Sequence, residues 1–65
     1  MPNNTRGDAK RRLEEAVSHL DWTLHHLKWI QETYATVSYV KDPTETVIAL
    51  IIACEEAIQK IKDSF

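Results

Sequence analysis

The chain has 65 residues with a formal net charge of −2, and 43% of its residues are hydrophobic. A domain this small buries only about 60% of the surface that its unfolded chain exposes, so its core is thin. Small domains commonly gain stability from disulfides, a structural metal or self-association. The single cysteine excludes an internal disulfide, and no paired Cys/His spacing predicts structural zinc. Self-association is therefore the remaining source of stability.

The first predicted element is a long helix that starts near Thr5 or Asp8, either of which can cap its N-terminus. Apolar residues then recur at spacings of three and four, which is the helical period: Leu13, Val17, Leu20, Leu24, Leu27 and Ile30. Residues 33–40 are rich in β-branched and aromatic side chains, but a lone strand would have no partner in this chain. We expect a helix over about residues 6–39, with residues 1–5 frayed.

A second helix is predicted to start at the sequence Asp42-Pro43-Thr44-Glu45. Asp42 can cap it, and proline suits the first helical position, where its missing N–H costs nothing. The residue before a proline is disfavoured from the helical region, so Asp42 should end the first helix. The second helix should cover residues 43–63, with an apolar seam at alternating spacings of four and three: Val47, Ile51, Cys54, Ile58, Ile61 and Phe65.

These two elements predict an all-α fold, an antiparallel two-helix hairpin that forms one domain over residues 1–65. A turn at residues 41–43 would bring Phe65 close to His19 or Leu20. The first helix would then extend two to three turns beyond the second. In a monomer this overhang would leave Leu13, Ala16 and Val17 uncovered.

Both helices carry more apolar surface than one partner helix covers. Trp22 and Trp29 lie nearly opposite the leucine side of the first helix, and Ile48 and Ile52 point away from the seam of the second. Large exposed apolar patches mark interaction sites. We predict that two hairpins, most simply as a homodimer, form a four-helix bundle. The predicted interface residues are Leu13, Val17, Trp22, Trp29, Ile30, Ile48 and Ile52.

No pattern of residues supports catalysis, a cofactor or a resident metal. The sequence has no nucleophile–base pairing and no glycine-rich phosphate loop, and Cys54 has no adjacent base. The leading hypothesis is a small, non-enzymatic oligomeric protein–protein interaction module: a regulator, adaptor or assembly component. Its partner would be a second copy of the chain or another protein.

A second hypothesis is a nucleic-acid-binding regulator that uses the basic start of the first helix. Residues 1–12 carry a formal charge of +3, from four bases that can contact phosphates: Arg6, Lys10, Arg11 and Arg12. Glu14 and Glu15 follow at once, and the chain as a whole is acidic. Nucleic-acid-binding domains are usually basic overall, so a solvated helix end is the favoured interpretation.

A third hypothesis is a metal site at the subunit interface. His19 and His26 share a face, so two subunits would bring four imidazoles near a two-fold axis, and imidazole binds zinc, copper and nickel. No Glu-x-x-His or His-x-x-x-His spacing supports this site. We therefore favour the two histidines as residues at the border of an apolar face.

The sequence predicts a cytoplasmic protein without a membrane segment. The longest apolar run, residues 47–54, is far shorter than the ~20 residues that span a bilayer. The polar N-terminal residues contain no secretory signal, and a lone cysteine fits a reducing compartment.

Overall fold

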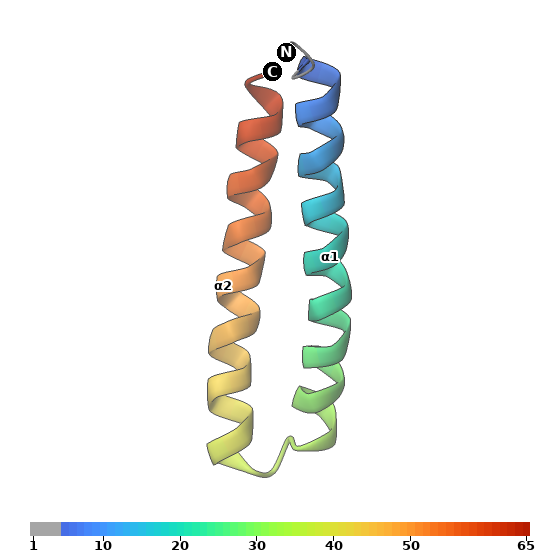
Figure 1. Ribbon diagram of the computed structural model, residues 1–65. Coiled ribbons are helices and arrows are strands. Elements are labelled where there is room, and N and C mark those ends of the chain that lie inside the picture. The colour runs from blue at the N-terminus through green and yellow to red at the C-terminus, as the bar shows by residue number, and fades with distance from the viewer. Residues whose placement is uncertain (1–4) are drawn as a thin grey trace.

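The structure, a computed structural model, describes residues 5–65 as two antiparallel helices, α1 (Arg6–Thr33) and α2 (Ser38–Asp63). The molecule measures 52 × 16 × 15 Å. Residues 34–37 connect the helices at one end, and the start of α1 lies beside the end of α2 at the other (Figure 1). The predicted all-α hairpin is therefore confirmed. The expected fraying of residues 1–5 falls, except for Thr5, outside the described residues.

The start of α1 agrees with the capping pattern of the sequence. The Thr5 hydroxyl oxygen accepts a hydrogen bond from the Asp8 backbone N–H at 3.1 Å. A side chain that accepts from the first turn satisfies an amide that has no partner within the helix. The Asp8 carboxylate in that turn also interacts favourably with the positive end of the helix dipole.

The predicted helix boundaries at residues 39 and 43 are wrong, because the turn occurs several residues earlier. α1 ends at Thr33, and α2 already begins at Ser38. The backbone N–H groups of Val40 and Lys41 both donate to the Val37 carbonyl, at 3.0 and 2.8 Å, which closes the first turn of α2. Pro43 consequently lies inside α2 and not at its first position.

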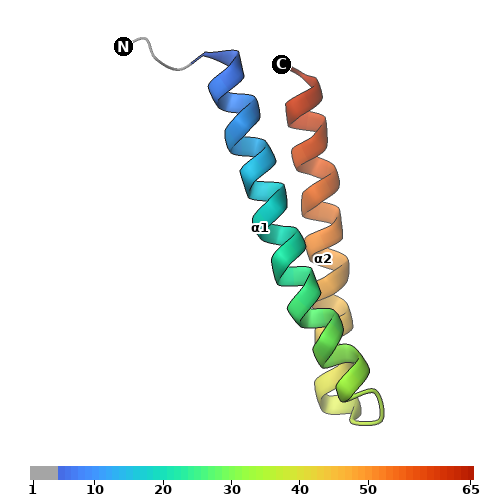
Figure 2. The same ribbon diagram turned by 90° about the vertical axis from the view of Figure 1, so that its right-hand side faces the viewer.

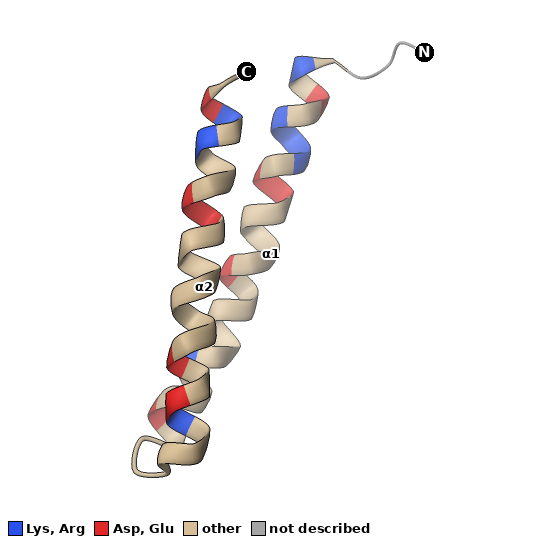
Figure 3. Cartoon of the chain, turned by 90° about the vertical axis from the view of Figure 1, so that its left-hand side faces the viewer, with Lys and Arg blue, Asp and Glu red and all other residues tan. Residues whose placement is uncertain are grey.

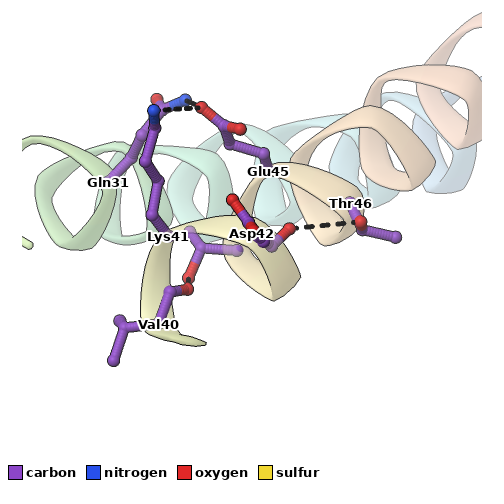
Figure 4. Close-up of polar contacts among 7 residues, drawn as sticks. Gln31, Val40, Lys41, Asp42, Glu45 and Thr46 are labelled. Atoms are coloured by element: carbon purple, nitrogen blue, oxygen red, sulfur yellow. Dashed lines mark hydrogen bonds and ion pairs between the residues drawn. The ribbon is translucent and has the colours of Figure 1, made fainter. Parts of the chain in front are cut away.

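Matching helix lengths explain why the proline does not set the boundary. An interior proline costs roughly 3 kcal/mol, because it removes a backbone hydrogen bond and crowds the carbonyl four residues back. With Pro43 in its interior, α2 has 26 residues and lies beside an α1 of 28 residues, so the two helices can pack over nearly their whole length. Close to Pro43, the Thr44 hydroxyl donates to the Val40 carbonyl at 2.7 Å, and the Thr46 hydroxyl donates to the Asp42 carbonyl at 3.2 Å, the latter drawn in Figure 4.

The earlier turn also changes the register, so the predicted overhang of α1 does not exist. Lys62 Nζ lies 2.7 Å from Glu14 Oε2, and Gln31 Nε2 donates to Glu45 Oε2 at 3.1 Å. In both pairs the two residue numbers add up to 76. The side chains that were expected to be uncovered are instead half-buried along α2: Leu13, Ala16 and Val17.

The core between the helices is thin, as the length of the chain predicts. Among the described residues only two apolar side chains are buried, Leu24 and Ile48, together with the polar Thr44. The leucine side of α1 does face α2, as predicted, and most of it is half-buried: Leu13, Val17, Leu20 and Leu27.

The predicted seam of α2 is wrong for four of its six residues. Val47, Cys54, Ile61 and Phe65 are exposed, and only Ile51 and Ile58 are half-buried. The side of α2 that contacts α1 carries a different set at the same spacing: Thr44, Ile48, Ile51, Glu55, Ile58 and Lys62. Residues 47–54 are apolar all round, so periodicity alone fits two neighbouring stripes equally well. The polar contacts of Glu45 and Lys62 with α1 select between them.

Candidate interaction surface

An uncharged apolar stripe runs along the exposed side of α2. We call it the α2 stripe: Val47, Leu50, Cys54, Ala57 and Ile61, all exposed. Leu50 is 61% exposed and Ile61 is 50% exposed, which is unusual for large aliphatic side chains of one helix. The residues repeat at spacings of three and four, so they form a continuous line that another helix can pack against.

The apolar surface continues onto α1. Because both helices are right-handed and run antiparallel, the α2 stripe turns toward the same side of the hairpin as Ala16, Thr23 and Ile30. The Thr23 hydroxyl donates to the His19 carbonyl at 3.0 Å, so it needs no partner from outside its own helix. The α2 stripe and these three residues together form what we call the open face.

The opposite edge of the hairpin is polar. The ion pair between Lys62 and Glu14 lies there, and a hydrogen bond and the charge of Lys62 hold the pKa of Glu14 below its ordinary value. Near the turn, Glu45 accepts from Gln31 and lies 3.9 Å from the Lys41 ammonium group (Figure 4). Charged and polar side chains therefore cover this edge of the hairpin, whereas the open face is apolar.

One carboxyl pair lies within the contact between the helices. A hydrogen bond shared with Asp21 raises the pKa of Glu55, and loss of hydration and the charge of Asp21 add to the effect, while Lys28 opposes it. Glu55 Oε2 is buried without a hydrogen-bond partner. The sequence did not predict this pair, because the predicted seam contained Cys54 and not Glu55.

The predicted interface residues do not form one surface in the hairpin. Val17 and Leu13 are half-buried along α2, Ile48 is buried in the core, and Ile30 is half-buried at the open face. The remaining three are exposed but lie apart: Trp22, Trp29 and Ile52. The two tryptophans project from α1 on the side away from α2, and Ile52 borders the polar edge of α2.

The Trp22 ring belongs to a small exposed aromatic cluster on the outer side of α1. It stacks on His25 with ring centroids 5.1 Å apart and an angle of 3° between the planes. His26 meets the same indole edge-on at 5.2 Å. Stacked and edge-on arrangements are the favourable geometries for such rings. The cluster orders these side chains without burying them.

The basic side chains proposed for phosphate binding lie at the open end of the hairpin, where α1 begins (Figure 3). All four are exposed, but two already have partners within the chain. Arg11 Nη2 is paired with Asp8 Oδ1 at 3.3 Å, and Arg6 Nη1 donates to the Phe65 carbonyl at 3.3 Å. Lys10 and Arg12 complete the set, which is too short to form a basic stripe.

The two histidines proposed as metal ligands, His19 and His26, are exposed. Over residues 5–65, no three His, Cys, Asp or Glu side chains come close enough together to hold a metal ion. A hollow of about 340 Å³ at the open end is lined by Thr5, Arg6, Asp8, Ala9, Arg12 and Phe65. The Thr5 hydroxyl that lines this hollow already caps α1 by accepting from the Asp8 backbone N–H.

This chain matches no known protein family, no curated protein and no solved structure. Neither helix, over the described residues, combines the length and apolar character needed to cross a membrane. The functional argument accordingly rests on the surface of the hairpin itself.

Proposed function

We propose that this chain is a small, non-enzymatic protein–protein interaction module that works as a homodimeric four-helix bundle, in a regulatory, adaptor or assembly role. One observation carries the proposal. The stripe of α2 that faces α1 includes Thr44, Glu55 and Lys62, whereas the wholly apolar α2 stripe faces outward. Rotating α2 about its axis would hide the α2 stripe inside a monomer. The observed orientation of α2 is favourable if a partner covers the α2 stripe, because the apolar side chains are then buried.

The energy available from covering the α2 stripe is large for a chain of this size. Burial of a Val, Leu or Ile side chain contributes roughly 1.5–3 kcal/mol. A single core in a domain below about 70 residues rarely supplies more than 3–5 kcal/mol of stability. Covering Val47, Leu50 and Ile61 would therefore contribute about as much as the whole intrachain core.

The surface area of the hairpin points the same way. The chain exposes 5043 Å², whereas roughly 4,200 Å² is typical for a monomeric protein of its mass. Part of the excess comes from the elongated shape, since a single pair of helices leaves most of each helix facing water.

Light scattering coupled to size-exclusion chromatography tests the proposal. We expect a particle of twice the 7.5 kDa chain mass at micromolar concentration, with helical circular dichroism. Thermal unfolding should then shift to higher temperature as the concentration rises, since association stabilises the folded state by mass action. A fully helical monomer whose unfolding does not depend on concentration would contradict the proposal.

A further inference from the structure

The start of α1 and the end of α2 lie at the same end of the hairpin, which fixes the residues that are level with each other (Figure 2). Thr33 and Ser38 flank the turn, and the Arg6 side chain reaches the Phe65 carbonyl at the open end. The residue numbers in each of these pairs add up to 71. The longer polar contacts add up to 76, because helical side chains lean toward the N-terminus of their own helix and meet from positions a few residues apart.

The α2 stripe has the same spacings when it is read in either direction. Pro43 is also exposed, four residues before Val47, and extends the stripe to positions separated by four, three, four, three and four residues. The midpoint of this set is position 52. A second copy of α2, antiparallel about a two-fold axis at that level, would place residues of one copy opposite those of the other as follows: Pro43 over Ile61, Val47 over Ala57 and Leu50 over Cys54.

The α1 part of the open face has the same property. Ala9 is half-buried and extends it by one position, so that its residues recur at intervals of seven: Ala9, Ala16, Thr23 and Ile30. The midpoint of this set lies between positions 19 and 20. An antiparallel second copy of α1 would place Ile30 over Ala9 and Thr23 over Ala16. Since the Thr23 hydroxyl is already bonded to the His19 carbonyl, it can be covered without leaving an unpaired group.

The two midpoints lie at the same level of the hairpin. Position 52 of α2 is level with position 19 of α1, because level positions add up to 71. The midpoint of the α1 set is within one residue of this level, and one residue is a rise of about 1.5 Å. A single two-fold axis that crosses both helices at this level can therefore relate α1 to α1 and α2 to α2.

The sizes of the side chains favour this arrangement. The half of the open face nearer the turn carries large aliphatic side chains: Ile30, Val47 and Leu50. The half beyond the axis is small except at its end, where Ile61 lies: Ala16, Cys54 and Ala57. An antiparallel second copy puts large side chains over small ones, which lets facing helices interdigitate. Stacking with both turns at the same end would put Cys54 over Ala16, two small residues, and leave a gap in the core.

The charges favour the same antiparallel arrangement. The open end, residues 6–15 and 60–65, carries six bases and four acids, a formal charge of +2. The turn end, residues 28–46, carries two bases and three acids, a formal charge of −1 (Figure 3). Antiparallel stacking puts the positive end of one hairpin over the negative end of the other. Stacking with both turns at the same end would put two positive ends together, which is repulsive.

We infer that the partner of the open face is a second copy of this chain, docked with the two turns at opposite ends around a two-fold axis level with position 52 of α2 and positions 19–20 of α1. This inference rests on the proposed homodimer and specifies its geometry. α2 then packs along α2 and α1 along α1, so the bundle has only antiparallel neighbours. Each hairpin contributes half of the core of the bundle.

A disulfide between facing positions tests the geometry directly. V47C and A57C, introduced together with C54A, give two thiols that lie ten residues apart on one helix, about 15 Å, but face each other across the axis. A disulfide needs Cα atoms within about 7 Å, so none can form within one α2. Mild oxidation with copper phenanthroline should convert most of the protein into a covalent dimer on a non-reducing gel.

The matched controls carry only one of these two cysteines, again with C54A. In the inferred dimer, two copies of the same position lie about 15 Å apart along the helix axis, since they are ten residues apart in register. The yield of covalent dimer from either control should be several-fold lower than from the pair. An equal or higher yield from a control would place the axis at a different level.

A pair of substitutions on α2 provides an independent readout. L50Q places a polar group in the α2 stripe and should raise the dimer dissociation constant about ten- to a hundredfold. I52Q changes a residue that is also exposed, 42% against 61% for Leu50, but lies outside the open face. It should leave the dissociation constant unchanged. Both side chains are exposed in the hairpin, so neither change should unfold it.

The outcomes separate this geometry from the proposed function. A dimer by light scattering, with efficient linkage of V47C to A57C and a selective effect of L50Q, supports the inference. A dimer that does not link through this pair, or that dissociates with I52Q and not with L50Q, overturns the geometry and leaves the interaction module standing. A folded monomer overturns both.

Discussion

Glu55 of α2 lies beside Asp21 of α1, so the contact between the two helices includes two carboxyl groups side by side. One oxygen of Glu55 is buried without a partner. Two charged carboxylates side by side repel each other, so the pKa of Glu55 lies above its ordinary value. The Lys28 charge reduces the effect but does not reverse it.

The raised pKa of Glu55 predicts a hairpin that loses stability as the pH rises. The stabilising contribution is complete below the ordinary pKa of 4.5 and is lost as the pH rises through the raised value in the folded state. E55Q keeps a hydrogen-bonding group without the charge. It should therefore raise the melting temperature at pH 7 and have little effect under strongly acidic conditions.

Thermal unfolding followed by circular dichroism across this pH range, at one fixed protein concentration, checks the effect of E55Q. E56Q removes the same charge from the neighbouring exposed position and serves as the control. A melting temperature at pH 7 that falls in E55Q while E56Q is unaffected would mean that the Glu55 carboxylate stabilises the contact.

Glu14 has the opposite dependence on pH. Its pKa is lowered by Lys62, so its contribution is present above 4.5 and is lost as the pH falls through the lowered value. K62Q should cause a small loss of stability at pH 7, because the pair is partly exposed and screened by salt. The loss should disappear in about 1 M salt, where the Debye length is near 3 Å. A loss of the same size at all pH values and salt concentrations would assign the effect to packing of the lysine chain.

The early turn predicts that Pro43 destabilises α2. P43A should stabilise the protein by about 2 kcal/mol, since an interior proline costs roughly 3 kcal/mol and its rigidity in the unfolded chain returns up to about 1. Urea unfolding monitored by circular dichroism measures the change. D42A is the matched control: a capping role would make its loss cost about 1 kcal/mol. Stabilisation by P43A with no effect of D42A fits a helix that begins at Ser38, and the reverse pattern contradicts it.

The sequence predicted what depends on local pattern and missed what depends on the fit between the helices. The leucine side of α1 has only one set of apolar residues at helical spacing, so Leu24 was correctly expected to face α2. α2 carries two such sets, and the choice between them depends on contacts such as Lys62 with Glu14 that no single-helix pattern contains. The predicted position of the turn was wrong for a related reason. The Pro43 signal is local, whereas helix length is decided by the pairing of the whole hairpin.

The sequence predicted that an apolar interaction surface exists, but not which residues of α2 form it. Excess apolar surface on both helices pointed to self-association, but Ile48 was placed on the outside and is buried, while Cys54 was placed in the seam and is exposed. Exchanging the two stripes of α2 moves Cys54 outward and Ile48 inward, while Ile51 and Ile58 stay at the contact with α1. The open face became definable only when the register was fixed.

Leu24 provides a test of the intrachain core. It is 8% exposed, and large-to-small changes of buried leucines cost roughly 2–5 kcal/mol. Because the core contains few other buried side chains, L24A should abolish cooperative unfolding or leave the chain largely unfolded at low concentration. L20A, at a half-buried position of the same face, should cost less. Equal losses for the two variants, measured by urea unfolding, would contradict a core centred on Leu24 and Ile48.

The tryptophans provide the last test, because they lie outside the open face. Trp22 and Trp29 are 64% and 59% exposed and project away from α2, so a homodimer that covers the open face leaves them in water. The double variant W22Q and W29Q should dimerise as the unchanged chain does. In the unchanged chain, tryptophan emission should not shift to shorter wavelength on association. Dissociation of the double variant, or a blue shift on association, would place the interface on the outer side of α1. If the dimer forms without them, two exposed indoles remain on each subunit as an apolar surface for a different protein.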